Sequence, residues 1–355
     1  MQSMFFANYS IGTDAYEAAP GVCAPYGRRA FVVGGEKALA AGLPKLKAAL
    51  AGSPIEIAGV ELYGRDCTYS EMQRLADLAR EREADMVFGM GGGRAMDTAK
   101  GCAAKAGLPV FTFPTIASTC SATTSLSVTY NDDGTFKDFF RYPRPARHAF
   151  IDTEVIAASP WKYTQAGIGD TMGKFFESRF SGRGEVLAHK NALGLTISEM
   201  CYEPMKRFAV KALEDAKAGR TSDELTEICL ANIVSTGLVS LCVDEPYNCA
   251  IAHSVYYGLT VLPDFEANFL HGNVVAYGIL VQLMVDADES RARELKALMD
   301  ALGIAAKLSQ MGIELSHANL DGICESISKM PDMTHIPYPV SGAMIYEAMR
   351  RVEAL

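Results

Sequence analysis

The sequence predicts an α/β domain with a doubly wound, Rossmann-like parallel sheet, followed by an all-helical domain. Over roughly the first 150 residues, short apolar runs alternate with stretches in which apolar residues recur at helical spacing. Strands that alternate with helices indicate a parallel sheet covered by helices. Beyond Pro160, β-branched runs become scarce and helical spacing prevails. A chain of 355 residues is long enough for two cores, so we expect one domain over residues 1–158 and a second over residues 159–355.

The individual elements follow from apolar runs that end in glycine, proline or aspartate and from the amphipathic stretches between them. We expect strands at 30–35 (AFVVGG), 55–64 (IEIAGVELYG), 86–93 (MVFGMGGG), 109–115 (PVFTFPT) and 148–152 (HAFID), with helices at 36–52 and 70–83. Long stretches with helical spacing in the second domain are 171–180, 192–219 and 223–243.

The composition excludes several classes of protein. A net charge of −9 argues against a nucleic-acid binder, which usually carries a basic patch. The nine cysteines form no C-x-x-C pair, which argues against a cysteine-based zinc site and is typical of reduced thiols in a cytoplasmic protein. The N-terminus lacks the pattern of a signal peptide. The sequence also contains no continuous run of about twenty apolar residues, the pattern that would predict a membrane span.

Three consecutive glycines follow the apolar run Met86–Phe88 in the stretch MVFGMGGGRAMDTAK. Glycines at a strand-to-helix junction leave backbone N–H groups bare at a helix N-terminus, where a phosphate binds readily. The motif is neither G-x-G-x-x-G nor a P-loop, so it fits a pyrophosphate cradle and an ordinary tight turn about equally well.

Polar groups occur in apolar helical surroundings at three places in the second domain. They are Asp170 in AGIGDTMGKFFE, His253 in AIAHSVYYGL and His271 in ANFLHGNVVAYG. Two imidazoles and a carboxylate would make a site for zinc or ferrous iron with an open coordination position. Each histidine taken singly also fits a hydrogen-bonded core residue. His335, in the loop-like MTHIPYP, is a further candidate for the active site.

The segments GMGGGRAMDTAK, FPTIASTCSATTSLSVTYNDDG, AGIGDTMGKFFE, IAHSVYYGLTVLP and FLHGNVVAYGILVQ together resemble the glycerol dehydrogenase branch of the iron-containing (group III) alcohol dehydrogenases. The resemblance implies the dehydroquinate synthase-like fold, with an active site between a dinucleotide-binding domain and a helical metal domain. It implies that Asp170, His253 and His271 hold one divalent metal. It further implies that the cofactor contacts Gly91, Gly92, Gly93, Arg94, Ala95, Asp97, Thr115, Ser118, Thr124, Leu126, Val128 and Tyr130.

Two departures from the family pattern bear on the substrate. Ferrous members carry a histidine one turn after the aspartate, where this chain has Lys174, so zinc is expected over iron. Glycerol dehydrogenases carry an aspartate after PTIAST, where this chain has Cys120. Cys120 together with Lys174 resembles the hydroxycarboxylate dehydrogenases of the family, because an ammonium one turn from a metal ligand can pair with a substrate carboxylate. The expected substrate is therefore a small 2-oxo or 2-hydroxy acid, unless Lys174 extends into solvent. A polyol or simple alcohol is the alternative.

A third departure bears on the nucleotide. NAD-dependent relatives place an aspartate at the end of the first strand, where it bonds the ribose and repels a 2′-phosphate. This chain has Gly35 there, with Lys37 close behind, which favours NADP(H) over NAD(H), although Glu36 opposes it.

No residue is a clear general acid. The resemblance implies a proton route through solvent or the cofactor ribose, and His335 and Tyr257 are candidates to contribute to it. The resemblance also implies a homo-oligomer. The remaining alternatives are a catalytically silent nucleotide-binding protein, which the intact ligand set opposes, and a dehydroquinate synthase, for which the basic phosphate-binding residues are missing.

Overall fold

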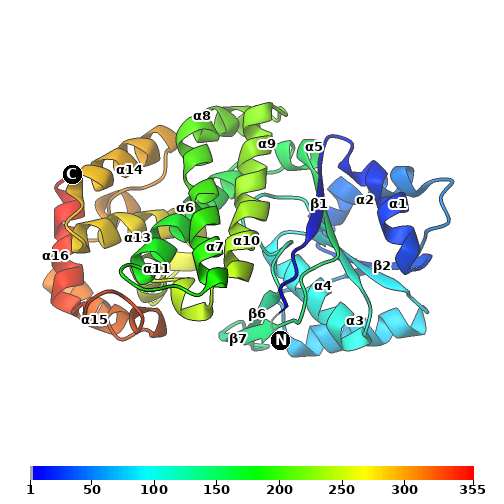
Figure 1. Ribbon diagram of the computed structural model, residues 1–355, viewed down its shortest axis with the longest axis horizontal. Coiled ribbons are helices and arrows are strands. Elements are labelled where there is room, and N and C mark those ends of the chain that lie inside the picture. The colour runs from blue at the N-terminus through cyan, green and yellow to red at the C-terminus, as the bar shows by residue number, and fades with distance from the viewer. Residues whose placement is uncertain (1–2) are drawn as a thin grey trace. The chain divides into compact units, whose positions relative to one another are not determined.

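The computed structural model describes residues 3–355, which form two compact units (Figure 1). The first unit contains Met1–Trp161 and Glu214–Leu241, and the second contains Lys162–Leu213 and Cys242–Leu355. The helical stretch 214–241 therefore packs with the α/β unit, whereas the sequence placed it in the helical half. Within the first unit, Thr123 Oγ1 donates to the carbonyl of Ile233 over 2.5 Å and Asn232 Nδ2 donates to the carbonyl of Ala117 over 2.9 Å.

A six-stranded parallel sheet forms the centre of the first unit, with the strand order β1-β8-β5-β4-β2-β3. All five predicted strands are present, and the predicted doubly wound fold is confirmed. The bounds are β1 (Asn8–Gly12), β2 (Arg29–Gly34), β3 (Glu56–Leu62), β4 (Met86–Gly91), β5 (Val110–Pro114) and β8 (His148–Asp152).

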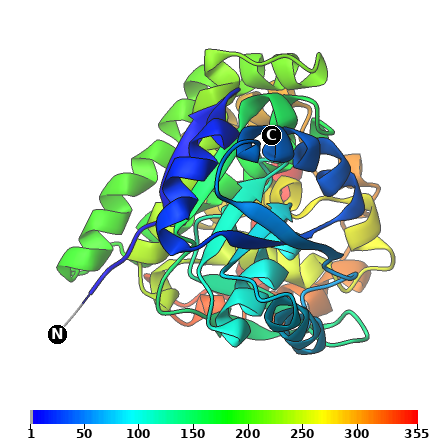
Figure 2. The same ribbon diagram turned by 90° about the vertical axis from the view of Figure 1, so that its right-hand side faces the viewer.

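Helices cover both faces of this sheet because successive side chains of each strand point to opposite sides. Along β2, Ala30 and Val32 pack on one face with Leu46 of helix α2 (Glu36–Leu50), and Phe31 and Val33 pack on the other. Helices α3 (Tyr69–Glu81) and α4 (Gly93–Ala106) supply the partners on that second face. Figures 1 and 2 show α2 on one side of the strands and α3 with α4 on the other. The other short helices of this part are η1 (Ala15–Ala18), α1 (Ala19–Cys23), η2 (Ala24–Tyr26) and α5 (Thr153–Ala157).

A two-stranded antiparallel hairpin, β6 (Leu126–Tyr130) and β7 (Phe136–Arg141), was not predicted as a pair of strands. Its turn NDDG ends in Gly134 at φ 89°, which is the left-handed conformation that favours glycine. The turn residues were visible in the sequence. Strand β1 was missed as well, because NYSIG is short and mostly polar.

The second unit contains only helices among its described residues, as predicted. It comprises α6 (Lys162–Ser181), α7 (His189–Ile197), η3 (Ser198–Cys201), most of α8 (Glu203–Lys217), η5 (Glu245–Tyr247), α11 (Ile251–Leu259), α12 (Phe265–Asn268), α13 (His271–Val285), α14 (Glu289–Leu302), η6 (Ser309–Met311), α15 (His317–Ile327), η7 (Pro331–Met333) and α16 (Gly342–Glu353).

One helical segment, Asp223–Cys242, is long and apolar enough to cross a membrane by composition, with a mean hydropathy of 1.6. It comprises α9 (Asp223–Cys229), the π-helix η4 (Leu230–Ser235) and α10 (Thr236–Cys242). This segment is not a continuous apolar run, but Asn, Ser and Thr interrupt its apolar residues without lowering the mean hydropathy much. Burial of 61% of its most apolar window inside the protein explains the composition without a membrane.

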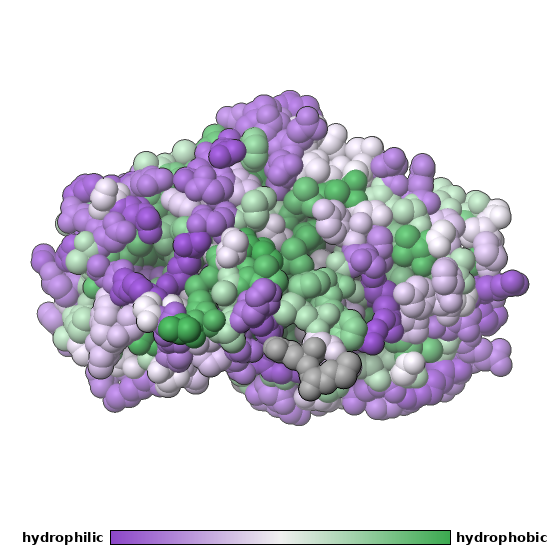
Figure 3. Space-filling view, in the orientation of Figure 1, coloured by the Kyte–Doolittle hydropathy of each residue, from purple (hydrophilic) through white to green (hydrophobic). Residues whose placement is uncertain are grey.

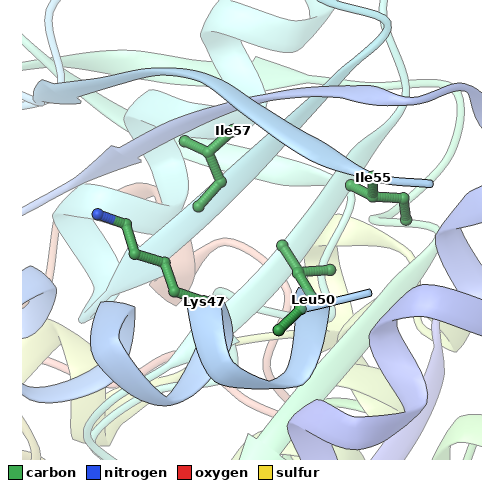
Figure 4. Close-up of a pocket in the computed structure, with 5 residues that line it drawn as sticks. Lys47, Leu50, Ile55 and Ile57 are labelled. Carbon is green, nitrogen blue, oxygen red and sulfur yellow. The ribbon is translucent and has the colours of Figure 1, made fainter. Parts of the chain in front are cut away.

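The surface seen in Figure 3 carries mostly hydrophilic residues with smaller hydrophobic areas among them. A shallow pocket of about 210 Å³ lies between the end of α2 and β3, lined by Lys47, Leu50, Ala51, Ile55 and Ile57 (Figure 4). Its lining is apolar apart from one lysine, so it offers no constellation of catalytic groups.

Helices α6 and α13 approach each other closely at a pair of glycines, Gly169 and Gly272. A Cβ on Gly272 would overlap the carbonyl oxygen of Ala166 and lie 2.9 Å from the backbone nitrogen of Asp170. A Cβ on Gly169 would overlap the carbonyl oxygen of Gly272. Only hydrogen atoms fit at this crossing, so these glycines set the spacing of the two helices.

We therefore predict that Gly272→Ala lowers the free energy of unfolding by about 3 kcal/mol, because the two backbones must separate. Gly322→Ala, on helix α15, is the matched control, since a Cβ there meets nothing within 4 Å. It should raise stability by about 1 kcal/mol through helix propensity. Denaturant unfolding measures both changes, and equal effects would contradict the role assigned to the crossing.

Candidate functional site

Three helices of the second unit bring Asp170, His253 and His271 together. Asp170 lies in α6, His253 in α11, and His271 is the first residue of α13. Asp170 Oδ1 is 3.5 Å from His253 Nε2 and 3.3 Å from His271 Nε2. One donor atom from each residue lies within 4.8 Å of the other two. The convergence that the sequence predicted is present in the structure.

This donor set fits a divalent cation. Two imidazole nitrogens and one carboxylate oxygen are a ligand set found in catalytic zinc sites, which keep a further position for substrate. Burial raises the pKa of the Asp170 carboxyl, but hydrogen bonds and positive charge from His253 and His271 outweigh it and hold that pKa far below its usual range. Asp170 is therefore ionised at neutral pH. The His271 side chain is 36% exposed, which leaves one side of the set accessible.

A fourth residue, Glu177, completes the support of this cluster and was not singled out from the sequence. Its carboxylate is fully buried and accepts a hydrogen bond of 2.5 Å from Nδ1 of His253. It also accepts bonds from the backbone N–H groups of Ala250 and His253, at 2.8 Å and 2.9 Å. The sequence carried one indication, because Asp170, Lys174 and Glu177 recur at i, i+4 and i+7 on α6 and so share one helix face.

His271 is held by an aromatic contact. The ring of Tyr256 meets it edge-on with a centroid separation of 4.3 Å, and the Tyr256 hydroxyl donates to Glu266 Oε1 over 2.8 Å. The two imidazoles lie with their ring centres 5.4 Å apart. Each imidazole of the set is thus held in place by packing or a hydrogen bond in addition to its contact with Asp170.

Lys174 lies one helical turn after Asp170 and is only 6% exposed, so it does not extend into solvent. Its ammonium donates to the backbone oxygen of Asn248 at 3.2 Å and to the side-chain oxygen of Asn248 at 2.9 Å. A buried ammonium close to a candidate metal centre is the most unusual charge in the site, because burial of lysine is costly.

Asp332 belongs to η7, which packs against the helix that carries His253. Burial raises the pKa of its carboxyl, and the neighbouring Glu177 and Glu245 add to the rise, whereas His253 and Lys174 oppose it. Burial also raises the pKa of the Tyr257 hydroxyl. Asp332 was not noticed in the sequence, where a single aspartate in a loop carries no signature.

Cys249 forms a second group of possible donors with Glu177 and His253, again with one atom from each within 4.8 Å of the others. Cys249 is partly exposed, as is Cys120, whereas the other seven thiols are buried. Cys120 follows β5 in the first unit, and its backbone oxygen accepts from the backbone nitrogen and hydroxyl of Thr123 at 3.0 Å and 3.1 Å.

His335 is not part of either donor group. Its Nε2 lies 3.0 Å from Glu185 Oε1, and its ring meets Tyr247 edge-on at a centroid distance of 4.7 Å. The Tyr247 hydroxyl donates to Glu185 Oε2 over 2.6 Å. These contacts attach the loop that carries His335 to η5, which directly precedes Asn248.

In the first unit, the strand-to-helix turns after β2 and β4 lie side by side. The two strands are neighbours with Gly34 opposite Met90, at the point where the strand order reverses, and such a point is where open α/β sheets bind ligands. Gly91 has φ 150°, and a Cβ there would lie 2.8 Å from that of Ala95. A Cβ on Gly92, the N-cap of α4, would lie 2.6 Å from Ile116 Cδ1. The turn therefore requires glycine and leaves its backbone close to the helix N-terminus.

Asp97 of α4 joins the glycine turn to the segment between β5 and β6. Its carboxylate accepts from Ser121 Oγ at 2.5 Å and from the backbone nitrogen of Val128 at 3.1 Å. The buried Lys100 ammonium lies 3.0 Å from Asp97 Oδ1 and donates to Thr124 Oγ1 and the Leu126 carbonyl. Asp97 therefore positions the loop, and its carboxylate already has three partners.

The other predicted nucleotide residues surround the same turns. Arg94 forms a 2.7 Å ion pair with Asp66, and its guanidinium lies 5.3 Å from the centre of the Tyr130 ring. The backbone nitrogen of Thr115 donates to the Gly91 carbonyl over 3.0 Å, and Ser118 lies in the loop that follows. Gly35 is the N-cap of α2 and Lys37 is exposed in its first turn.

Comparison with known proteins identifies the family to which the chain is similar. Residues 7–153 match the family model described as iron-containing alcohol dehydrogenase. A glycerol dehydrogenase of Thermotoga maritima is 30% identical over 300 residues, covering 82% of this chain and 81% of the relative. Hydroxycarboxylate dehydrogenase A of Escherichia coli (strain K12) is 31% identical over 331 residues, covering 92% and 90%.

A solved structure extends the likeness to the whole fold. The crystal structure of a probable glycerol dehydrogenase from Sinorhizobium meliloti 1021 aligns with a TM-score of 0.85 at 26% identity, covering 100% of this chain and 99% of that one. One conclusion follows from the similarity in sequence, the fold and the converging donor set. The chain belongs to the iron-containing alcohol dehydrogenase family, in its glycerol dehydrogenase-like branch, and is a metal-binding oxidoreductase of that family.

Proposed function

We propose that this protein interconverts a small 2-oxo acid and the corresponding 2-hydroxy acid by hydride transfer with a nicotinamide cofactor. The observation that carries the proposal is the buried Lys174 ammonium, one helical turn from Asp170. Fixed positive charge beside a metal centre suits a substrate with a carboxylate next to its reacting carbonyl. A relative named hydroxycarboxylate dehydrogenase A, matched over 92% of this chain, supports the same substrate class.

Asp170, His253 and His271 would hold the metal, and the glycine turns after β2 and β4 would hold the nucleotide. When bound, the cation supplies Lewis-acid stabilisation of negative charge on the substrate oxygen, and the nucleotide supplies the hydride. Lys174 fixes the orientation of the substrate through its carboxylate, which lowers the entropic part of the barrier. Asn248 holds Lys174 in position through two acceptor oxygens at 2.9 Å and 3.2 Å.

The charges around Lys174 are consistent with an anionic substrate. Glu177 compensates the positive charge that remains when Asp170 alone faces a divalent cation. Asp332 opposes the attraction of such a substrate when ionised, and burial raises the pKa of its carboxyl.

The same residues support zinc as the metal. Lys174 stands where ferrous relatives carry a fourth ligand, and an ammonium has no lone pair to donate. The remaining three donors match catalytic zinc, although this set of nitrogen and oxygen ligands also accommodates ferrous iron. We further infer NADP(H) as the nucleotide, with NAD(H) as the alternative, and a homo-oligomeric, cytoplasmic enzyme.

A glycerol or other polyol dehydrogenase is the second candidate. The Thermotoga maritima relative named glycerol dehydrogenase, at 30% identity, favours it. Cys120 opposes it, because a thiol is a weak hydrogen-bond acceptor for a polyol hydroxyl compared with the carboxylate expected there.

The substrate class is tested by initial rates with 2-oxobutanoate and 2-oxoglutarate in the reducing direction and with glycerol in the oxidising direction. We expect a 2-oxo acid to give the highest kcat/KM. Glycerol turnover that exceeds it by a wide margin would replace this proposal with the polyol alternative.

Lys174→Met should lower kcat/KM for 2-oxobutanoate about 100-fold, because it removes a buried charge that pairs with the substrate. The change should affect an uncharged aldehyde of similar length far less. Lys329→Met, at an exposed surface ion pair with Glu325, is the control and should change neither. An equal loss of kcat/KM for the acid and for the aldehyde would show that Lys174 does not bind the substrate carboxylate.

NADPH should give a higher kcat/KM than NADH, and Lys37→Ala should lower the NADPH value about 10-fold by removing a charged contact to the 2′-phosphate. Lys47→Ala, in the last turn of the same helix, is the matched control. A strong preference of the unmodified enzyme for NADH would contradict this assignment.

A further inference from the structure

We propose that Glu177 is a positioning residue that fixes the tautomer of His253 and thereby sets the affinity of the centre for its metal. The inference rests on the metal centre of the proposed function and does not depend on which substrate the enzyme uses. It concerns a residue that contacts neither the reacting atoms nor the other two candidate ligands in the described contacts.

Both carboxylate oxygens of Glu177 are committed to helix α11. Oε1 accepts from the backbone N–H groups of Ala250, the N-cap, and His253, in the first turn, at 2.8 Å and 2.9 Å. An anion at a helix N-terminus satisfies donors that have no partner within the helix. Because Oε1 is held by the backbone, Oε2 has a fixed position 2.5 Å from Nδ1 of the His253 ring.

This contact determines which nitrogen of the His253 ring carries the proton. An ionised carboxylate only accepts hydrogen bonds, so Nδ1 must carry the proton. In neutral imidazole the lone pair is then on Nε2, which lies 3.5 Å from Asp170 Oδ1 and faces the donor set. A metal needs this lone pair, and a ring that keeps its proton on Nδ1 toward Glu177 offers Nε2 to the metal.

The contact between Glu177 and His253 is closely packed. A Cβ on Gly173, one turn before Glu177 in α6, would lie 3.3 Å from Glu177 Oε2 and 3.4 Å from His253 Cε1. Glu177 itself is 0% exposed.

Glu177→Gln separates this role from a purely structural one. The amide oxygen still accepts both backbone N–H groups, but the amide nitrogen then faces Nδ1 and donates to it. That contact moves the ring proton to Nε2 and blocks the ligand position. We expect zinc affinity, measured by competition with a chromophoric chelator, to fall about 10- to 100-fold.

Asp152→Asn is the matched control. Asp152 is equally buried and its Oδ1 also accepts two backbone N–H groups, from Glu154 and Val155 at 3.0 Å each, but it lies in the first unit. The Asp152→Asn variant should have a lower thermal stability than the unmodified protein but the same affinity for zinc. Zinc affinity in Glu177→Gln within about twofold of the unmodified protein would overturn the inference.

A second measurement needs no folded variant. Long-range ¹⁵N–¹H spectra of the six histidine rings in the zinc-loaded native protein should show the ring assigned to His253 protonated at Nδ1 and bound at Nε2. Protonation of His253 at Nε2 would overturn the inference. If the native protein binds no zinc at all, both the proposed metal centre and the positioning role are refuted. If Glu177→Gln binds zinc as tightly as the native protein does, only the positioning role is refuted.

Discussion

The structure of the second unit depends on one interaction, the convergence of Asp170 and two imidazoles at the crossing of three helices. A buried carboxylate is costly unless it is paired, and here His253 and His271 provide the pairing at 3.5 Å and 3.3 Å. Gly169 and Gly272 bring the backbones of α6 and α13 into contact beside Asp170. The same close approach that packs the helices therefore creates the donor set.

A second layer of charge surrounds this set and determines what it can bind. Glu177 lies behind His253, whereas Lys174 lies one turn from Asp170 with Asn248 as its support. Asp170, Lys174 and Glu177 are buried, so their charges act in a poorly screened environment. Such a site distinguishes substrates by charge more sharply than by size, which is why the fixed ammonium matters more for the proposed substrate class than any apolar contact.

Much of this could be predicted from the sequence. Asp170, His253 and His271 stand out because each interrupts an apolar helical pattern, and the five main strands stand out because glycine, proline or aspartate ends each run. Glu177 could not be recognised in the same way, since a glutamate near the end of a long helix is normally solvated. Its role depends on which helix packs against it. The segment 214–241 looked like part of the helical half because its own pattern is helical, and only contacts such as those between Asn232 and Ala117 reveal its true neighbours.

The most direct test of the central claim is X-ray absorption spectroscopy at the metal edge of the purified protein, combined with elemental analysis. Close to one zinc per chain, with two imidazoles and low-atomic-number oxygen ligands in the first shell, is the expected result. Absence of a stoichiometric metal, or a first shell without two imidazoles, would contradict the convergence of these three residues on a single cation.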